Sequence, residues 1–160
     1  MHRLITAMTE YEKGVPQRVQ HLLKVYAFSM AIAGEEGVDG ETCRVLEAAS
    51  ILHDIGIRPA LEVYGSAAGP YQEELGQEPA RKMLAELGYD DALIDRVAYL
   101  VGHHHSYAHI DGMDYQILVE ADFLVNIFEG GMAREEIDRV RENIFVTAAG
   151  KRYLDAMFRA

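Results

Sequence analysis

The chain contains 160 residues, a length that suits one domain with a hydrophobic core of its own. Its formal net charge of −11 makes polymeric nucleic acid an unfavourable partner, because such binding requires Lys and Arg residues that neutralise phosphates. The single cysteine, Cys43, excludes an intramolecular disulfide. The sequence shows no signal-peptide pattern and no apolar run near ~20 residues, so we expect a cytoplasmic protein with no membrane partner.

Helical patterns dominate the first half of the chain, and patterns typical of strands do not recur. An amphipathic helix is predicted over residues 16–34, which begin with a proline and then repeat apolar residues with the helical period. A second helix is predicted over residues 41–56, which end in a glycine. The adjacent pair His53 and Asp54 falls in the last turn of this second helix.

The second half of the chain is also predicted to be helical. Residues 69–88 should form a helix interrupted near Gly76 and Pro79, and residues 90–105 restart on an acidic first turn. Three further helical segments are predicted: 114–131, 133–143 and 147–160. The pattern as a whole predicts an all-α protein.

Histidine and aspartate side chains collect on the predicted buried helices or at their ends. Five of the seven histidines lie there: His21, His53, His103, His104 and His105. Asp122 is the most informative acid, because the stretch "ILVEADFLVNIF" surrounds it with apolar residues. An ionised carboxylate in such a place is unfavourable unless it is paired or bound to a cation. Taken singly, each of these residues is better explained as a hydrogen-bonded core residue.

Taken together, the same residues favour a metal site. Imidazole and carboxylate groups are ligands of divalent metals such as Zn, Mn, Fe and Ni. Bundles of helices build metal sites from inward-facing side chains that come from separate helices. The sequence has no cysteine cluster, which disfavours a structural zinc site.

The order of these residues resembles the HD superfamily of metal-dependent phosphohydrolases. Members of that superfamily bind a divalent metal through one His, an adjacent His-Asp pair and a distant Asp. Here the matching residues are His21, His53, Asp54 and Asp122, with a further His supplied by "GHHH" between them. The "HDIG" context also matches, and the resemblance extends over roughly residues 16–127.

The resemblance implies the architecture and the chemistry. It implies one compact helical bundle of about six to nine helices over residues 1–160, with a core near 16–127 and C-terminal helices over 132–160 packed on it. It further implies hydrolysis of a phosphomonoester or phosphoanhydride in a small phosphorylated metabolite or nucleotide. The expected cofactor is a divalent ion, Fe, Mn, Ni, Co, Zn or Mg, with one or two ions per chain. A homodimer stays open.

A second metal site, which some family members carry, is only partly matched. His103 fits its later histidine best, because "YLVGH" resembles the apolar approach to that ligand, and His104 is the next choice. The earlier extra histidine is missing, and Gln72 stands near its place. Either Glu73 or Glu74 can complete the site if a carboxylate replaces an imidazole. The alternative for these two acids is a solvated helix face.

Three cations are candidates for binding the substrate phosphate. Arg18 is the first choice, because it lies one helical turn before His21 and a guanidinium can bind two phosphate oxygens. Arg58 and Lys24 come next. Each of the three has the alternative interpretation of a surface charge on an amphipathic helix.

Two residues have expected roles in catalysis beyond metal binding. Asp54 is expected to bind the metal and orient the attacking water. His104, if it is not a ligand, suits proton transfer, because an unperturbed imidazole has a pKa of ~6.5.

Two other function classes stay open at this point. The resemblance also reaches di-iron oxygenases, which use similar His and Asp ligands but need a full ligand set. The chain can also be a metal-binding or nucleotide-binding sensor without turnover. Sensors of this kind usually lose ligands, whereas this sequence keeps all four of the core residues.

Overall fold

The computed structural model describes residues 1–159, and within them every regular element is a helix. The elements are α1 (His2–Tyr11), α2 (Pro16–Glu36), α3 (Gly40–Leu52), α4 (Ile57–Tyr64), α5 (Gly69–Glu86), α6 (Asp91–Val101), the short 3-10 helix η1 (Tyr107–His109), α7 (Met113–Gly130), α8 (Arg134–Asn143) and α9 (Ala148–Phe158). This confirms the predicted all-α class and the predicted number of helices. No helix in the described part of the chain is long and apolar enough to cross a bilayer.

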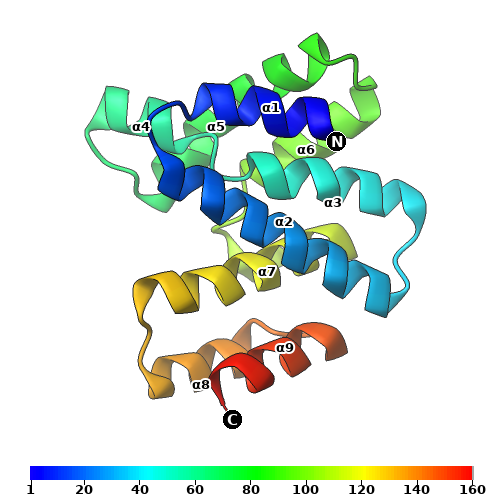
Figure 1. The fold of residues 1–160 in the computed structure, drawn as a ribbon, viewed down its shortest axis with the longest axis vertical. Helices are drawn as coiled ribbons and strands as arrows, with labels where there is room; N and C mark the ends of the chain where they lie inside the picture. The colour runs from blue at the N-terminus through cyan, green and yellow to red at the C-terminus, as the bar shows by residue number, and fades with distance from the viewer. Residues whose placement is uncertain (160) are drawn as a thin grey trace.

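Helices α2, α3 and α7 form the centre of the bundle (Figure 1). Helix α2 packs against both α3 and α7, while α6 packs on α3 and pairs with α5. In Figure 1, α1, α4, α5 and α6 lie on one side of this centre, and α8 and α9 lie at the opposite end. The central helices supply most of the largest buried apolar side chains: Ile32, Leu46, Ile51, Leu52, Ile117, Leu118 and Leu124.

Local sequence signals set the helix ends that matter for the site. Pro16 occupies the first turn of α2, where its missing N–H is not needed. The Asp39 side chain caps α3 by accepting hydrogen bonds from the backbone N–H groups of Glu41 and Thr42, each at 3.0 Å. Helix α3 ends at Leu52, so His53 and Asp54 lie in the turn that follows it rather than in its last turn.

Gly56 has a different role from the helix stop that the sequence indicates. Its φ of −70° is accessible to any residue, so backbone conformation does not require glycine there. A Cβ on Gly56 would instead overlap the carbonyl oxygen of Gln72, which shows that the chain after the His-Asp pair crosses α5 in close contact. On the other side of this crossing, a Cβ on Gly76 would lie 2.8 Å from Val101 Cγ1.

Helix α5 is continuous through Gly76 and Pro79, although the sequence predicted an interruption there. Packing of α5 against both α4 and α6 provides the tertiary support that local propensity does not. The close crossing at Gly76 accounts for the glycine without a break in the helix. Helix α1 was not predicted, yet it buries Leu4 and Met8 in the core.

Candidate metal centre

Four side chains from three parts of the bundle converge on one point. His21 comes from α2, His53 and Asp54 from the turn after α3, and Asp122 from α7. The His21 Nε2 atom lies 3.1 Å from Asp122 Oδ1 and 3.3 Å from His53 Nε2. The His53 Nε2 atom lies 3.5 Å from Asp122 Oδ1. The structure therefore brings together the four residues that the sequence singled out.

Asp54 also belongs to a second group of donor atoms. Its Oδ2 atom lies 3.5 Å from His21 Nε2, whereas its Oδ1 atom lies 3.5 Å from His104 Nε2. One donor atom from each of Asp54, His104 and His105 lies within 4.8 Å of the others. The two groups of donors are thus adjacent, and Asp54 presents one oxygen to each.

The two groups differ in how their histidines are held. His53 Nδ1 donates a hydrogen bond to the Ser50 carbonyl oxygen at 3.0 Å, and His104 Nδ1 donates to the Val101 carbonyl oxygen at 2.9 Å. Each bond fixes the proton on Nδ1 and directs Nε2 at the donor cluster. His104 Nε2 and His105 Nε2 are buried and have no hydrogen-bond partner within the described residues.

His103, the first choice from sequence for the second metal site, is not among the converging donors. Its Nδ1 atom donates to the Tyr99 carbonyl oxygen at 2.7 Å, and its ring stacks on the Tyr99 ring with centroids 4.2 Å apart. Successive residues in the turn after α6 point in different directions, so the apolar approach "YLVGH" does not identify which histidine points inward. The structure places His104 and His105 at the cluster instead.

Glu73 and Glu74, the two proposed replacements for the missing histidine, have other partners. Glu73 accepts hydrogen bonds from the His105 backbone N–H at 3.0 Å and from the Ser106 hydroxyl. Glu74 accepts a hydrogen bond from the Tyr64 hydroxyl at 3.0 Å. Glu73 therefore holds the turn that carries His105, and neither carboxylate belongs to the donor groups.

The three candidate phosphate-binding cations lie around the donor cluster, each with a partner. Arg18 donates from Nε to Glu12 Oε2 at 2.6 Å, and the Arg58 guanidinium lies over the Tyr11 ring, 5.3 Å from its centroid. The third cation, Lys24, donates to Glu129 Oε1 at 2.5 Å. None of the three belongs to the donor groups.

Glu129 is the residue at this site that the sequence reading missed. Its Oε2 atom accepts a hydrogen bond from His21 Nδ1 at 2.9 Å. The signal was available, because Glu129 follows Asp122 by seven residues on α7, and residues two turns apart lie on the same face of a helix. A charged residue near the end of an apolar helix is otherwise unremarkable in sequence.

The cluster perturbs the acidity of its own members. Burial alone lowers the pKa of His21, but the hydrogen bond to Asp122 and the charge of Asp54 outweigh burial and raise the pKa to about 9. Burial acts to raise the pKa of Asp122, and its hydrogen bonds to His21 and His53 lower it overall. His105 differs, because burial and the charge of His104 lower its pKa to about 4.

These shifts predict a pH dependence for protein stripped of metal by a chelator. His21 has a pKa of about 9 in the folded state and 6.5 as its reference value, so the folded state binds more protons between these values. The stabilisation is complete below pH ~6.5 and is lost as pH rises to ~9, by on the order of 3 kcal/mol. Urea unfolding from pH 6 to pH 9.5 measures it. A His21→Gln variant should lose most of this slope, and a wild-type free energy of unfolding that is flat with pH contradicts the assignment.

The donor set fits a bound divalent metal ion. Neutral imidazole nitrogens and ionised carboxylates are the forms that ligate metals, and both are present here. The buried Nε2 atoms of His104 and His105 lack partners among the described residues, and most buried polar atoms have one. The low pKa of His105 keeps its ring neutral near pH 7, which is the form that binds a metal.

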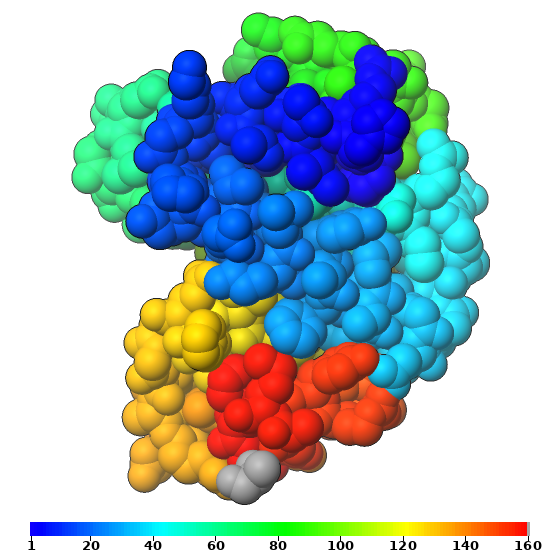
Figure 2. Space-filling model, viewed as in Figure 1, coloured from blue at the N-terminus to red at the C-terminus, as the bar shows by residue number. Residues whose placement is uncertain are grey.

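Two cavities flank different parts of the bundle. A groove of about 500 Å³ lies beside His21 and is lined by Pro16, Gln17, Gln20, Lys24 and Glu129. Figure 2 shows the surface hollowed between the start of α2 (blue) and the end of α7 (yellow). The carboxyl group of Glu129 contacts His21 and also lines the groove, so the groove reaches the edge of the donor cluster.

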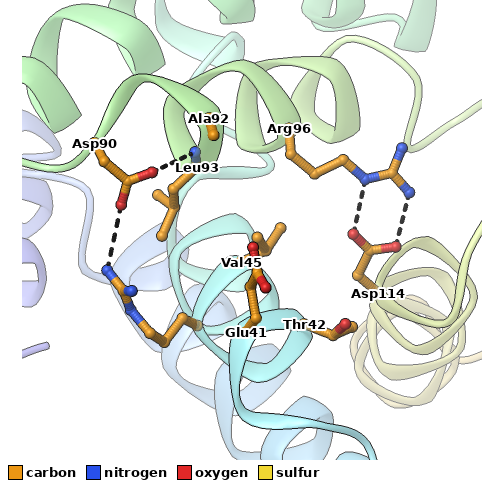
Figure 3. A pocket seen from close by; sticks show the side chains of 9 residues that line it. Glu41, Thr42, Val45, Asp90, Ala92, Leu93, Arg96 and Asp114 are labelled. Atoms are coloured by element: carbon orange, nitrogen blue, oxygen red, sulfur yellow. Dashed lines mark hydrogen bonds and ion pairs between the residues drawn. The ribbon is translucent and has the colours of Figure 1, made fainter.

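The second cavity, of about 230 Å³, lies among α3, α6 and the start of α7 (Figure 3). Arg96 forms two hydrogen bonds with Asp114 there, each at 2.8 Å, and Arg44 lies 3.5 Å from Asp90. Its cations are therefore paired with carboxylates of the cavity wall. None of the clustered histidines lines it, and we assign it no part in the chemistry.

Comparisons with known proteins agree with this geometry. The sequence model of the HD domain family matches residues 18–148, a span that includes both donor groups. The fold is similar to the crystal structure of a predicted HD superfamily hydrolase from an uncultured Thermotogales bacterium, with a TM-score of 0.70 and 22% identity. That similarity covers 99% of this chain and 85% of that chain. A comparison with curated proteins found no match.

Proposed function

Because the chain belongs to the HD domain family, whose members are metal-dependent hydrolases, we propose that it hydrolyses a phosphomonoester or phosphoanhydride bond. The substrate class is a small phosphorylated metabolite or nucleotide. The observation that carries this proposal is the convergence of His21, His53, Asp54 and Asp122 from separate helices onto one point.

The residues that would hold the metal follow from the two donor groups. His21, His53, Asp54 and Asp122 would hold one divalent ion. Asp54, His104 and His105 would hold a second, with Asp54 shared between the two. A divalent ion bound there supplies a coordinated water of lowered pKa and polarises a phosphoryl oxygen.

The protein side chains prepare the site for this chemistry. The backbone carbonyls of Ser50 and Val101 fix the rings of His53 and His104, so that their Nε2 lone pairs face the donor cluster before any ion arrives. The histidines lower the pKa values of Asp54 and Asp122, which keeps both carboxylates ionised at neutral pH. The buried walls of the site limit access by bulk water.

Binding of a phosphorylated substrate requires cations and space beside the metal ligands. The groove next to His21 has a volume in the range that small-molecule sites use, and Lys24 lies on its wall. Arg18 lies one turn before His21 on α2 and is 18% exposed, and its Nη1 atom has no hydrogen bond within the described residues. We propose Arg18 as the main phosphate-binding residue, with Lys24 and Arg58 as further contributors.

Removal of the Arg18 charge should weaken substrate binding without changing metal affinity. Because Glu12 is buried and pairs with Arg18, Arg18→Ala alone would leave a buried carboxylate unpaired and destabilise the fold. The better variant is the double substitution Arg18→Gln with Glu12→Gln, which removes both charges together. We expect its KM to rise by roughly ten-fold or more.

The control for this prediction is the single variant Glu12→Gln, which keeps the guanidinium. Its KM should stay within about two-fold of the wild-type value, because the phosphate-binding charge remains. Metal affinity, measured by competition with a chelating dye, should be equal in all three proteins. A wild-type KM in the double variant contradicts the role given to Arg18.

The experiment that tests the proposed function is a hydrolysis screen. Phosphorylated sugars, nucleoside monophosphates and dinucleoside polyphosphates are incubated with the chelator-treated protein, and Mn, Fe, Ni, Co, Zn and Mg are supplied in parallel. Release of inorganic phosphate or of a nucleotide product, dependent on the added metal and absent in Asp122→Asn, supports the proposal. No metal-dependent product from any of these classes sinks it.

One observation keeps the di-iron oxygenase as a second candidate function. The two donor groups share Asp54, an arrangement that suits two adjacent ions. Gln72 counts against it, because a carboxamide stands where the resemblance implies another histidine, and its Nε2 atom already donates to the Ala67 carbonyl oxygen at 2.7 Å. Two irons per chain after anaerobic purification, together with consumption of O2, would favour the oxygenase. A sensor without turnover would bind metal and yield no product in either assay.

A further inference from the structure

The three central histidine rings are oriented by two different kinds of partner. His53 and His104 each donate from Nδ1 to a backbone carbonyl three residues earlier in the chain. His21 instead donates from Nδ1 to the carboxylate of Glu129, a side chain on another helix. A backbone partner cannot be removed by substitution, whereas Glu129 can.

The position of each histidine in its helix explains this difference. The last four carbonyl groups of an α-helix lack intrahelical partners and are free to accept hydrogen bonds. Ser50 and Val101 lie in the last turns of α3 and α6, so their carbonyls serve His53 and His104. His21 lies inside the long helix α2, where the backbone carbonyls are already used. Its ring therefore needs a partner from outside its own helix.

Glu129 meets this need and is itself held by a second residue. Its Oε2 atom lies 2.9 Å from His21 Nδ1, and its Oε1 atom accepts a hydrogen bond from Lys24 Nζ at 2.5 Å. Lys24 follows His21 by three residues on α2, which places both on one face of that helix. The side chain of Glu129 is 33% exposed and that of His21 is 9% exposed, so the pair lies at the outer edge of the donor cluster.

We propose that Glu129 is a positioning residue that holds the His21 proton on Nδ1 and so directs the Nε2 lone pair at the metal, with Lys24 holding Glu129 in place. This inference rests on the proposed metal centre and deepens it. Carboxylate partners of metal-binding histidines fix the tautomer and ring orientation, and their loss typically lowers metal affinity by about 10–100-fold. Lys24 is then a support of the metal site as well as a candidate phosphate contact.

The test compares Glu129→Ala, Glu129→Gln and Lys24→Met with wild type, with metal affinity as the first readout. Competition of Zn²⁺ or Co²⁺ with a chelating dye measures the affinity without any substrate. We expect Glu129→Ala to lower the affinity of the tighter site by about 10–100-fold. Glu129→Gln should lose less, because the carboxamide oxygen still accepts from Nδ1, and Lys24→Met should lose less than Glu129→Ala. Glu135→Gln, an exposed acid on α8, is the matched control and should bind as wild type does.

The second readout is the His21 ring itself, followed by nitrogen-15 NMR of the Zn²⁺-loaded protein. In wild type the Nδ1 proton should be visible and slow to exchange, because it is held by Glu129. In Glu129→Ala it should exchange faster, while the helical circular dichroism of the variant is unchanged. Wild-type metal affinity together with a slow Nδ1 proton in Glu129→Ala would overturn the proposal.

Failure of this inference is distinguishable from failure of the proposed function. If wild type binds metal and the Glu129 variants lose affinity, the positioning role stands even when no phosphate ester is hydrolysed. If wild type hydrolyses a substrate and Glu129→Ala binds metal unchanged, the function stands and the positioning role fails.

Discussion

Asp54→Asn should abolish hydrolysis and empty both metal sites, because Asp54 is the one residue shared by the two donor groups. The substitution keeps the size of the side chain and removes its charge, so the histidines lose an anionic neighbour on each side of it. We expect the rate to fall by well over ~100-fold, the upper end for a group that only orients a ligand. Metal content per chain, measured by mass spectrometry of the dialysed protein, should fall from the wild-type value to near zero.

The matched control for Asp54→Asn is Asp114→Asn. Asp114 is also a buried carboxylate, 6% exposed, and it pairs with Arg96 in the second cavity, away from the donor cluster. This variant should be less stable than wild type and should keep its metal and its rate per folded molecule. If Asp54→Asn keeps full metal occupancy while its helical signal is intact, the assignment of the centre is wrong.

His104→Gln should have the second largest effect, and His103→Gln should have almost none. The Nε2 atom of His104 is buried, lacks a partner within the described residues and lies 3.5 Å from Asp54, whereas the ring of His103 stacks on Tyr99. We expect His104→Gln to lower the rate by roughly 100-fold and to lower metal content per chain. His103→Gln should stay within about three-fold of the wild-type rate.

The comparison of these neighbouring variants decides between the sequence-based choice and the structural one. Steady-state rates and metal content are measured for both under the same metal supply. Equal losses in the two variants would show that the turn after α6 rearranges when metal binds. A larger loss in His103→Gln would restore the choice made from sequence.

Helix periodicity and residue order were enough to predict the fold class and the core of the site. Apolar residues repeat every three to four positions along the segments that became α2, α3 and α7, and the burial of an apolar face is what makes a helix stable in a protein. Asp122 drew attention because a carboxylate inside such a face needs a partner. The order of His21, His53-Asp54 and Asp122 carried the resemblance that the family match over residues 18–148 confirms.

Sequence order failed where the direction of a side chain depends on a turn. Three consecutive histidines follow α6, and nothing in "GHHH" states which of them points inward. The structure directs His104 and His105 at Asp54 and leaves His103 on Tyr99. Outside a regular helix, side-chain direction depends on backbone angles that the period of 3.6 residues does not fix.

Sequence order also failed where the partner comes from a different helix. Glu73 and Glu74 lie beside the place of the missing histidine, yet they bond to the turn after α6 and to Tyr64. Glu129 lies 108 residues from His21 in the chain and contacts it directly. Which residues of two helices meet depends on the angle and the register at which the helices pack.

The sequence by itself therefore determined which residue types are buried, in what order they occur and that four of them suit one metal ion. Only the tertiary structure decided which histidine completes a second donor group, that Asp54 is shared and that Glu129 orients His21. The physical reason is that burial and helical period are local properties of a chain, written in the spacing of its residues. The meeting of side chains across helices is set by packing, which depends on all the helices at once.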